Sequence, residues 1–120
     1  GKDFGKLANL ADKSFLLQYA SGEMPMWRPC VLDSDDGVRV TAKVASYAPN
    51  EAGVYDQIGN VAEWTTTPWQ PPKGVAALPH VVAKGGSFRD RPRTATPFSK
   101  MPARPEMKFV DVGFRVIIEE

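Results

Sequence analysis

Cysteine and histidine are nearly missing from this sequence, which contains one residue of each, Cys30 and His80. A single cysteine cannot form a disulfide within one copy of the chain, and it cannot supply a cysteine-rich zinc site. With one histidine and no G-x-S-x-G motif, a Ser-His-Asp hydrolase is not predicted either. The shortage of cysteine and histidine therefore excludes a disulfide framework within one chain, a cysteine-rich structural zinc site and a serine-hydrolase triad.

An excess of charge of one sign is also missing, because 14 Asp and Glu residues balance 15 Lys and Arg residues, a formal net charge of +1. Nucleic-acid-binding domains are usually strongly basic, so we predict no nucleic-acid partner. No apolar run approaches the roughly 20 residues that a membrane-spanning helix needs, so we predict no membrane span. With 120 residues, of which 42% are hydrophobic, the chain has the size and composition of a single folded unit, residues 1–120.

Glycine and proline, by contrast, are plentiful, with 10 and 11 residues respectively. Helix interiors tolerate neither residue well, so we expect little helix, short strands and much irregular loop. The Phe-Leu-Leu sequence at 15–17 fits a short helix or a buried strand equally well. Residues 89–105 contain four prolines and no apolar period, which predicts a long arm without regular structure. Apolar segments bounded by turn residues predict strands at 38–42, 61–66, 81–84 and 112–118.

Four short motifs combine glycine with aromatic or charged residues: Gly53-Val54-Tyr55-Asp56, Gly59-Asn60-Val61-Ala62-Glu63-Trp64, Lys84-Gly85-Gly86-Ser87-Phe88 and Gly113-Phe114-Arg115-Val116. In order and spacing they resemble the signatures of formylglycine-generating enzymes and their relatives, the sulfatase-modifying-factor family. The stretch Ala8-Asn9-Leu10-Ala11-Asp12 resembles an upstream motif of the same family. The resemblance implies an α+β, C-type-lectin-like fold with short twisted sheets, few helices and much irregular loop. Because the family domain is usually longer, the chain would form its C-terminal portion.

The resemblance also identifies the positions at which catalysis would occur. In the active enzymes two cysteines follow the G-G-S-[WF] motif, bind copper(I) and oxidise a substrate cysteine with dioxygen. Asp90 and Ala95 stand at these two positions, and Cys30 lies in another segment. Copper(I) prefers soft thiolate ligands, so we expect no copper site and no formylglycine-generating activity.

Family members commonly bind calcium at two loops, and the matching positions form two candidate sets. The first set is Asn9, the Leu10 carbonyl, Asp36 and the Val38 carbonyl; the second is Asp56, the carbonyls of Gly59 and Val61, and Glu63. Calcium takes six to eight oxygen ligands, and irregular backbone can direct carbonyl oxygens toward such an ion. The alternative is that Asp36 and Asp56 only cap turns. We expect structural calcium at both sets.

The resulting functional expectation is a non-catalytic, calcium-stabilised binding or structural module, a pseudoenzyme of this family. The alternative is part of an oxidoreductase, formylglycine-generating or sulfoxide-synthase-like, whose active site lies in residues outside this chain. Residues 84–91, Lys-Gly-Gly-Ser-Phe-Arg-Asp-Arg, resemble a variant found in bacterial surface and secretion lipoproteins. That variant favours a bacterial, periplasmic or extracellular protein that binds a protein or peptide.

A further expectation concerns the partner of the chain itself. If these motifs belong to the C-terminal portion of a larger domain, the surface facing the remainder should be apolar. The partner would then be the N-terminal half of the same family domain or a second copy in a homo-oligomer. The predicted strand 112–118 would lie at this junction, because Val112, Phe114, Val116 and Ile118 share one face.

Overall fold

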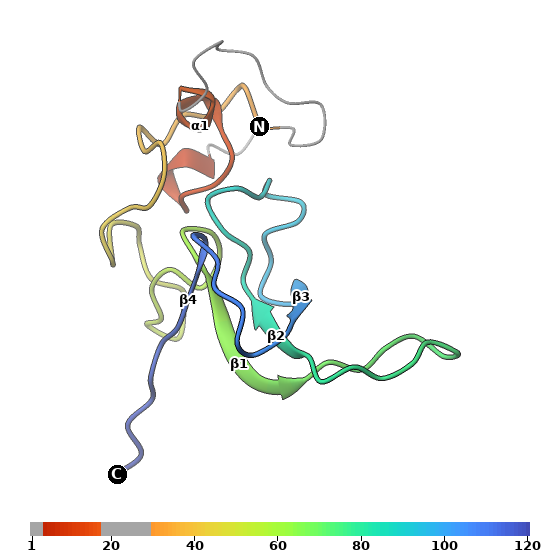
Figure 1. Cartoon of the computed structure of the whole chain (residues 1–120). Helices are drawn as coiled ribbons and strands as arrows, with labels where there is room; N and C mark the ends of the chain where they lie inside the picture. The colour runs from red at the N-terminus through yellow and green to blue at the C-terminus, as the bar shows by residue number, and fades with distance from the viewer. Residues whose placement is uncertain (1–3, 18–29) are drawn as a thin grey trace.

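The computed structural model describes residues 4–17 and 30–120 (Figure 1). A four-stranded sheet in the order β3-β2-β1-β4 forms its centre, and two short helices lie at the end of the molecule opposite the C-terminus. Strand β1 runs antiparallel to β2 and parallel to β4, and β2 runs antiparallel to β3. The elements in chain order are η1 (Phe4–Lys6), α1 (Lys13–Leu16), β1 (Ala62–Pro68), β2 (Val81–Lys84), β3 (Lys100–Ala103) and β4 (Val112–Gly113). Few helices and a curled mixed sheet confirm the expected α+β class.

Helix α1 resolves the ambiguity of the Phe-Leu-Leu segment in favour of a helix. Asp12 is its N-cap, and its Oδ1 accepts hydrogen bonds from the backbone N–H groups of Ser14 (2.9 Å) and Phe15 (3.4 Å). An aspartate at this position satisfies donors that a helix N-terminus otherwise leaves without partners. The helix turns the Phe15 ring into the core, where it is 1% exposed.

Two of the four predicted strands are confirmed: β2 has the predicted bounds, and β1 begins one residue later and ends two residues later than predicted. The strand predicted at 38–42 is wrong. Side-chain amides take the backbone groups that a neighbouring strand would need. Asn60 Oδ1 accepts from Ala42 N (2.8 Å), and Asn9 Nδ2 donates to the Val40 carbonyl (2.7 Å).

The arm 89–105 and the strand 112–118 also need correction. The arm contains β3, in which Pro102 pairs with Val82. Proline is tolerated there because β3 is an edge strand of the sheet. Only the first two residues of the segment 112–118 form a strand, β4. The residues that follow run away from the sheet toward the C-terminus (Figure 1).

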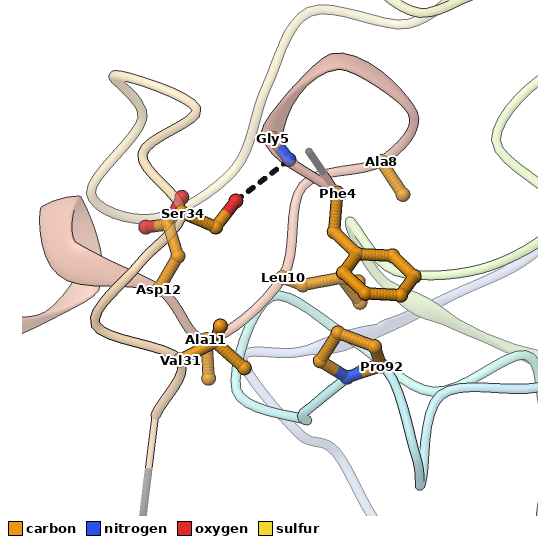
Figure 2. A pocket seen from close by; sticks show the side chains of 9 residues that line it. All are labelled: Phe4, Gly5, Ala8, Leu10, Ala11, Asp12, Val31, Ser34 and Pro92. Carbon is orange, nitrogen blue, oxygen red and sulfur yellow. Dashed lines mark hydrogen bonds between the residues drawn. The ribbon is translucent and has the colours of Figure 1, made fainter. Parts of the chain in front are cut away.

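Two small clusters of buried apolar side chains lie among the described residues, in addition to the buried residues of the sheet. Ala8, Leu10 and Ala95 form one of them, with Phe4 and Ile58 packed against it. The second consists of Ala11, Phe15 and Phe88, with Cys30 packed against it, and the two phenylalanine rings lie 6.2 Å apart. Figure 2 shows the hollow beside the first cluster, where Phe4 and Leu10 face Pro92 and Gly5 N donates to Ser34 Oγ (2.8 Å). This hollow has no room for a water molecule, so it is part of the core.

None of the described residues belongs to a helix that is long and apolar enough to cross a membrane.

Candidate functional site

In the first predicted cation set, Leu10 and Val38 contact the Asp36 carboxylate through their backbone N–H groups, and not through the carbonyl oxygens predicted as ligands. Asp36 Oδ1 accepts a hydrogen bond from Val38 N (2.7 Å), and Asp36 Oδ2 accepts one from Leu10 N (3.3 Å). The Asp36 carboxylate therefore links its own loop to Leu10, which lies 26 residues earlier in the chain.

Asn9, the remaining member of the first set, is 1% exposed and carries an unsatisfied oxygen. Its Nδ2 group donates to the Val40 carbonyl and to Asn60 Oδ1 (3.2 Å), whereas Asn9 Oδ1 is buried and has no hydrogen-bond partner among residues 4–17 and 30–120. Such an acceptor costs about 1–3 kcal/mol when nothing satisfies it. A hard cation is a suitable partner for this oxygen, so Asn9 Oδ1 fits the chemistry of a calcium ligand.

Negative charge is concentrated beside the first set. Asp36 N donates to the Asp12 carboxylate, and Asp35 Oδ1 accepts from Ser14 Oγ and from Gly37 N (3.1 Å). Desolvation by burial raises the pKa of Asp12 and of Asp36, and each is raised further by a neighbouring carboxylate. A cation here would offset this mutual repulsion.

Tyr47 belongs to the same neighbourhood and was not predicted from the sequence. Burial raises the pKa of its phenol, and the negative charges of Asp36 and Asp12 and a hydrogen bond to the Asp36 side chain raise it further. Tyr47 lies 11 residues beyond Asp36 in a loop without a recognisable motif, so the sequence offered no signal for it.

The second predicted set is arranged differently, because a guanidinium lies within it. Asp56 Oδ2 accepts from Ala45 N (2.7 Å), and Asp56 Oδ1 is buried with no hydrogen-bond partner among the residues that the structure describes. Both Glu63 carboxylate oxygens, however, accept hydrogen bonds from Arg115: Nε lies 2.6 Å from Oε2 and Nη2 lies 2.5 Å from Oε1. The G-N-V-A-E-W and G-F-R motifs are thus joined by an ion pair.

Gly59 and Asn60 connect the two sets. Asn60 N donates to the Asn9 carbonyl (2.8 Å), and Gly59 N donates to the Gly85 carbonyl (3.1 Å). Gly59 has a φ of +73°, and a Cβ atom built on it would lie 2.3 Å from the Asn9 carbonyl oxygen. Only glycine allows the backbone to come this close, which explains a glycine at this position of the motif.

Within the described chain, no three His, Cys, Asp or Glu side chains converge to hold a metal ion. An ion at the first set would therefore depend on amide and backbone oxygens as well as on carboxylates, a mixture that calcium accepts.

The two positions of the family's paired cysteines are neighbours in the structure. A Cβ atom built on Gly86 would lie 2.7 Å from Ala95 Cα and 3.4 Å from Asp90 Oδ2. Ala95 is 1% exposed and belongs to the first core cluster, whereas Asp90 is half-buried. Cys30 is half-buried and packs against the second core cluster, and desolvation by burial raises the pKa of its thiol, which disfavours the thiolate.

A pocket of about 240 Å³ opens beside Asp90. At its polar end, Ser87 Oγ lies 3.2 Å from Asp90 Oδ2 and 3.1 Å from Asp111 Oδ2, and Ser87 is 1% exposed. Sequence reasoning missed Asp111 and Lys100 because they come from segments outside the G-G-S-F motif. The pocket is lined by Ala62, Ala83, Gly86, Ser87, Asp90, Thr94, Ser99, Lys100, Met101 and Asp111.

Residues 12–120 match the sulfatase-modifying factor enzyme 1-like domain, and the chain belongs to this family. Among characterised proteins, it is 36% identical over 69 residues to the formylglycine-generating enzyme of Bos taurus and 38% identical over 63 residues to that of Mus musculus. These matches cover 50% and 45% of the chain but only 18% and 17% of the two enzymes. The predicted family is therefore confirmed.

Solved structures confirm the fold. PvdO from Pseudomonas aeruginosa matches 92% of the chain with a TM-score of 0.63 and 26% identity, and CarF matches 91% with a TM-score of 0.55 and 25% identity. Treponema denticola variable protein 1 shares the fold, with a TM-score of 0.60 at 22% identity. The chain spans 38%, 31% and 36% of these three structures, respectively.

Proposed function

We propose that this chain is a non-catalytic, calcium-stabilised binding or structural module of the sulfatase-modifying-factor family. The observation that carries the proposal is the pair of positions beside Gly86, which hold Asp90 and the buried Ala95 in place of the family's cysteines. A carboxylate and a methyl group cannot provide the two thiolates that copper(I) prefers.

The catalytic side of this proposal is tested with a peptide that carries a sulfatase-type cysteine. Incubation of the peptide with this protein, copper and oxygen should leave its mass unchanged, because the thiolate pair is missing. The bovine formylglycine-generating enzyme, assayed in parallel, provides the positive control. A decrease in peptide mass that depends on this protein would contradict a non-catalytic role.

Calcium at the first set would have a structural role. Asn9 and Asp36 would provide side-chain oxygens, and the Leu10 and Val38 carbonyls would complete the protein ligands. The support is the buried Asn9 Oδ1, which no group in the described part of the chain satisfies, together with the charge of Asp12 and Asp36. The bound ion would supply positive charge and fix the loops, without taking part in a reaction.

The binding role is placed at the pocket beside Asp90. Asp90 and Asp111 are the two carboxylate residues of its lining, and Lys100 is its basic residue. A short peptide that presents hydrogen-bond donors toward the two carboxylates is the ligand class that this chemistry favours.

The alternative function, part of an oxidoreductase, is favoured by one observation. Both matched mammalian enzymes generate formylglycine by name, and the chain spans less than a fifth of their length. Metal analysis and the peptide assay on the complete gene product separate the two functions, because only the oxidoreductase needs a redox metal elsewhere in that polypeptide.

We also propose that the segment after β4 is covered by the remainder of a family domain or by a second copy of the chain. Its apolar side chains are largely solvent-exposed: Phe114 77%, Val116 77%, Ile117 85% and Ile118 87%. Isolated domains rarely leave such continuous apolar segments uncovered.

The isolated chain should therefore self-associate in light scattering and bind a hydrophobic dye. Replacing Val116, Ile117 and Ile118 together by serine should reduce both signals, because this removes most of the exposed apolar surface of the segment. Val44→Ser, at a site 76% exposed elsewhere, is the control and should change little. A stable monomer without dye binding would contradict the covered-segment proposal.

A further inference from the structure

We propose that the Arg115 guanidinium takes the place of calcium at the second loop, residues 55–63, and we call it the resident cation of that loop. The chain then binds one calcium ion, at the first set, and not two. The calcium at the first set rests on the function proposed above. The resident cation does not, because its evidence lies entirely in the contacts of Arg115.

Arg115 makes four hydrogen bonds to this loop. Two go to the Glu63 carboxylate, as described above, and Nη2 also donates to the carbonyl oxygens of Tyr55 (2.9 Å) and Asp56 (3.3 Å). The side chains of Arg115 and Glu63 are 38% and 25% exposed, so the pair is partly shielded from water. A charge-assisted, two-pronged pair of this kind is among the strongest polar contacts in proteins.

The position of Arg115 follows from the sheet. Strand β4 runs parallel to β1, and Glu63 pairs with Gly113 in this register. Arg115 follows two residues later, just beyond the end of β4, and its guanidinium reaches Glu63 and the carbonyls of Tyr55 and Asp56 through the four hydrogen bonds given above. The strand pairing thus fixes the neighbouring backbone, and the hydrogen bonds fix the guanidinium.

Calcium and the guanidinium compete for the same oxygens. Calcium requires oxygen ligands at about 2.3–2.6 Å, and both Glu63 oxygens already have an Arg115 nitrogen at 2.5–2.6 Å. A calcium ion bound by Glu63 would also lie next to a positive charge. The first set differs, because no Lys or Arg nitrogen is hydrogen-bonded to Asp36 or Asn9 among the contacts of the described residues.

Removing the guanidinium should convert the second loop into a calcium site. Asp56 and Glu63 would then keep two negative charges without a counter-ion, and the buried Asp56 Oδ1 has no hydrogen-bond partner. The Tyr55 and Asp56 carbonyls would be released as further oxygen ligands. Such a set of hard oxygens is what calcium selects.

The test is calcium stoichiometry, measured by isothermal titration and equilibrium dialysis with calcium alone. The native chain should bind one ion per chain, Arg115→Ala should bind two, and Arg115→Lys, which keeps the charge, should remain at one. Arg104→Ala removes an exposed arginine elsewhere and should leave the stoichiometry at one. If Arg115→Ala does not fold, Arg115→Gln takes its place.

A second measurement uses the native Arg115. Glu63→Gln should leave calcium stoichiometry and affinity unchanged if Glu63 is not a ligand, whereas loss of one ion would overturn the proposal. Two ions on the native chain, or no additional ion on the neutral Arg115 variants, would overturn it as well. No ion on the native chain but one on the neutral variants would refute calcium at the first set and leave the resident cation supported.

Discussion

Replacement of Gly59 by alanine is expected to reduce the unfolding free energy by about 3 kcal/mol or more. A left-handed conformation costs a non-glycine residue roughly 1–2 kcal/mol, and Gly59 has a φ of +73°. The new methyl group would also lie 2.3 Å from the Asn9 carbonyl oxygen. Relieving such a contact by moving backbone typically costs a further ~1–3 kcal/mol.

Gly53 provides a matched control for this variant. Its φ is +76°, but a Cβ atom there would meet nothing within 4 Å. Gly53→Ala should therefore cost only the conformational part, about 1–2 kcal/mol. Thermal unfolding followed by circular dichroism compares the two, and Gly59→Ala should melt more than about 10 °C below the native chain. Equal losses in the two variants would show that the contact with Asn9 is unimportant.

Removal of calcium is expected to have the second large effect. A ligand that binds only the folded state at one hundred times its Kd adds about 2.7 kcal/mol of stability. A chelator should therefore lower the melting temperature by several degrees. Asp36→Ala should abolish most of this difference, because Asp36 is the carboxylate of the first set.

Asp33→Ala is the control for Asp36→Ala, since it removes the same charge from an exposed position three residues away. It should retain the native response to calcium. Identical melting curves in calcium and in chelator for the native chain would exclude a stabilising ion.

The contribution of Asp12 and Asp36 to the pH dependence of stability should differ in sign between the protein in chelator and the protein in calcium. Burial raises the pKa of Asp12 and Asp36 above their ordinary value of 3.8, so the folded state binds their protons more tightly than the unfolded state does. In chelator, these two groups should make the protein more stable as the pH falls through their folded pKa values. In calcium, the same protons compete with the ion, and the calcium-dependent stabilisation should decline over that range.

Local patterns in the sequence were sufficient to predict some of the strands and to identify the family. The Val-Val-Ala-Lys strand ends at two glycines and was found with correct bounds, and the four motifs identified the family. The 38–42 segment has equally good alternation, but Asn9 and Asn60 bind its backbone from distant positions. No local pattern can reveal that competition.

The candidate sites show the same limit. Asp36 was predicted to lie with Leu10 and Val38, and its carboxylate accepts hydrogen bonds from the N–H groups of both residues; calcium binding there stays a prediction. Tyr47 and Asp111 reach their sites through the fold alone, so neither could be predicted without it. Arg115 was visible as part of the G-F-R motif, but its partner Glu63, 52 residues away, became apparent only through the parallel pairing of β4 with β1.

The two edges of the sheet differ in their protection against pairing with another strand, and Pro102 is the main reason. It lies in β3, at one edge, where it has no N–H group to offer to an incoming strand, and Lys100 adds a charge to the same edge. Proline and lysine are residues that natural edge strands use against unwanted pairing. The opposite edge strand, β4, has neither, and Phe114 and Arg115 connect it to the apolar Val-Ile-Ile sequence at 116–118. Of the two edges, the β3 edge is therefore the better protected against pairing with a further strand.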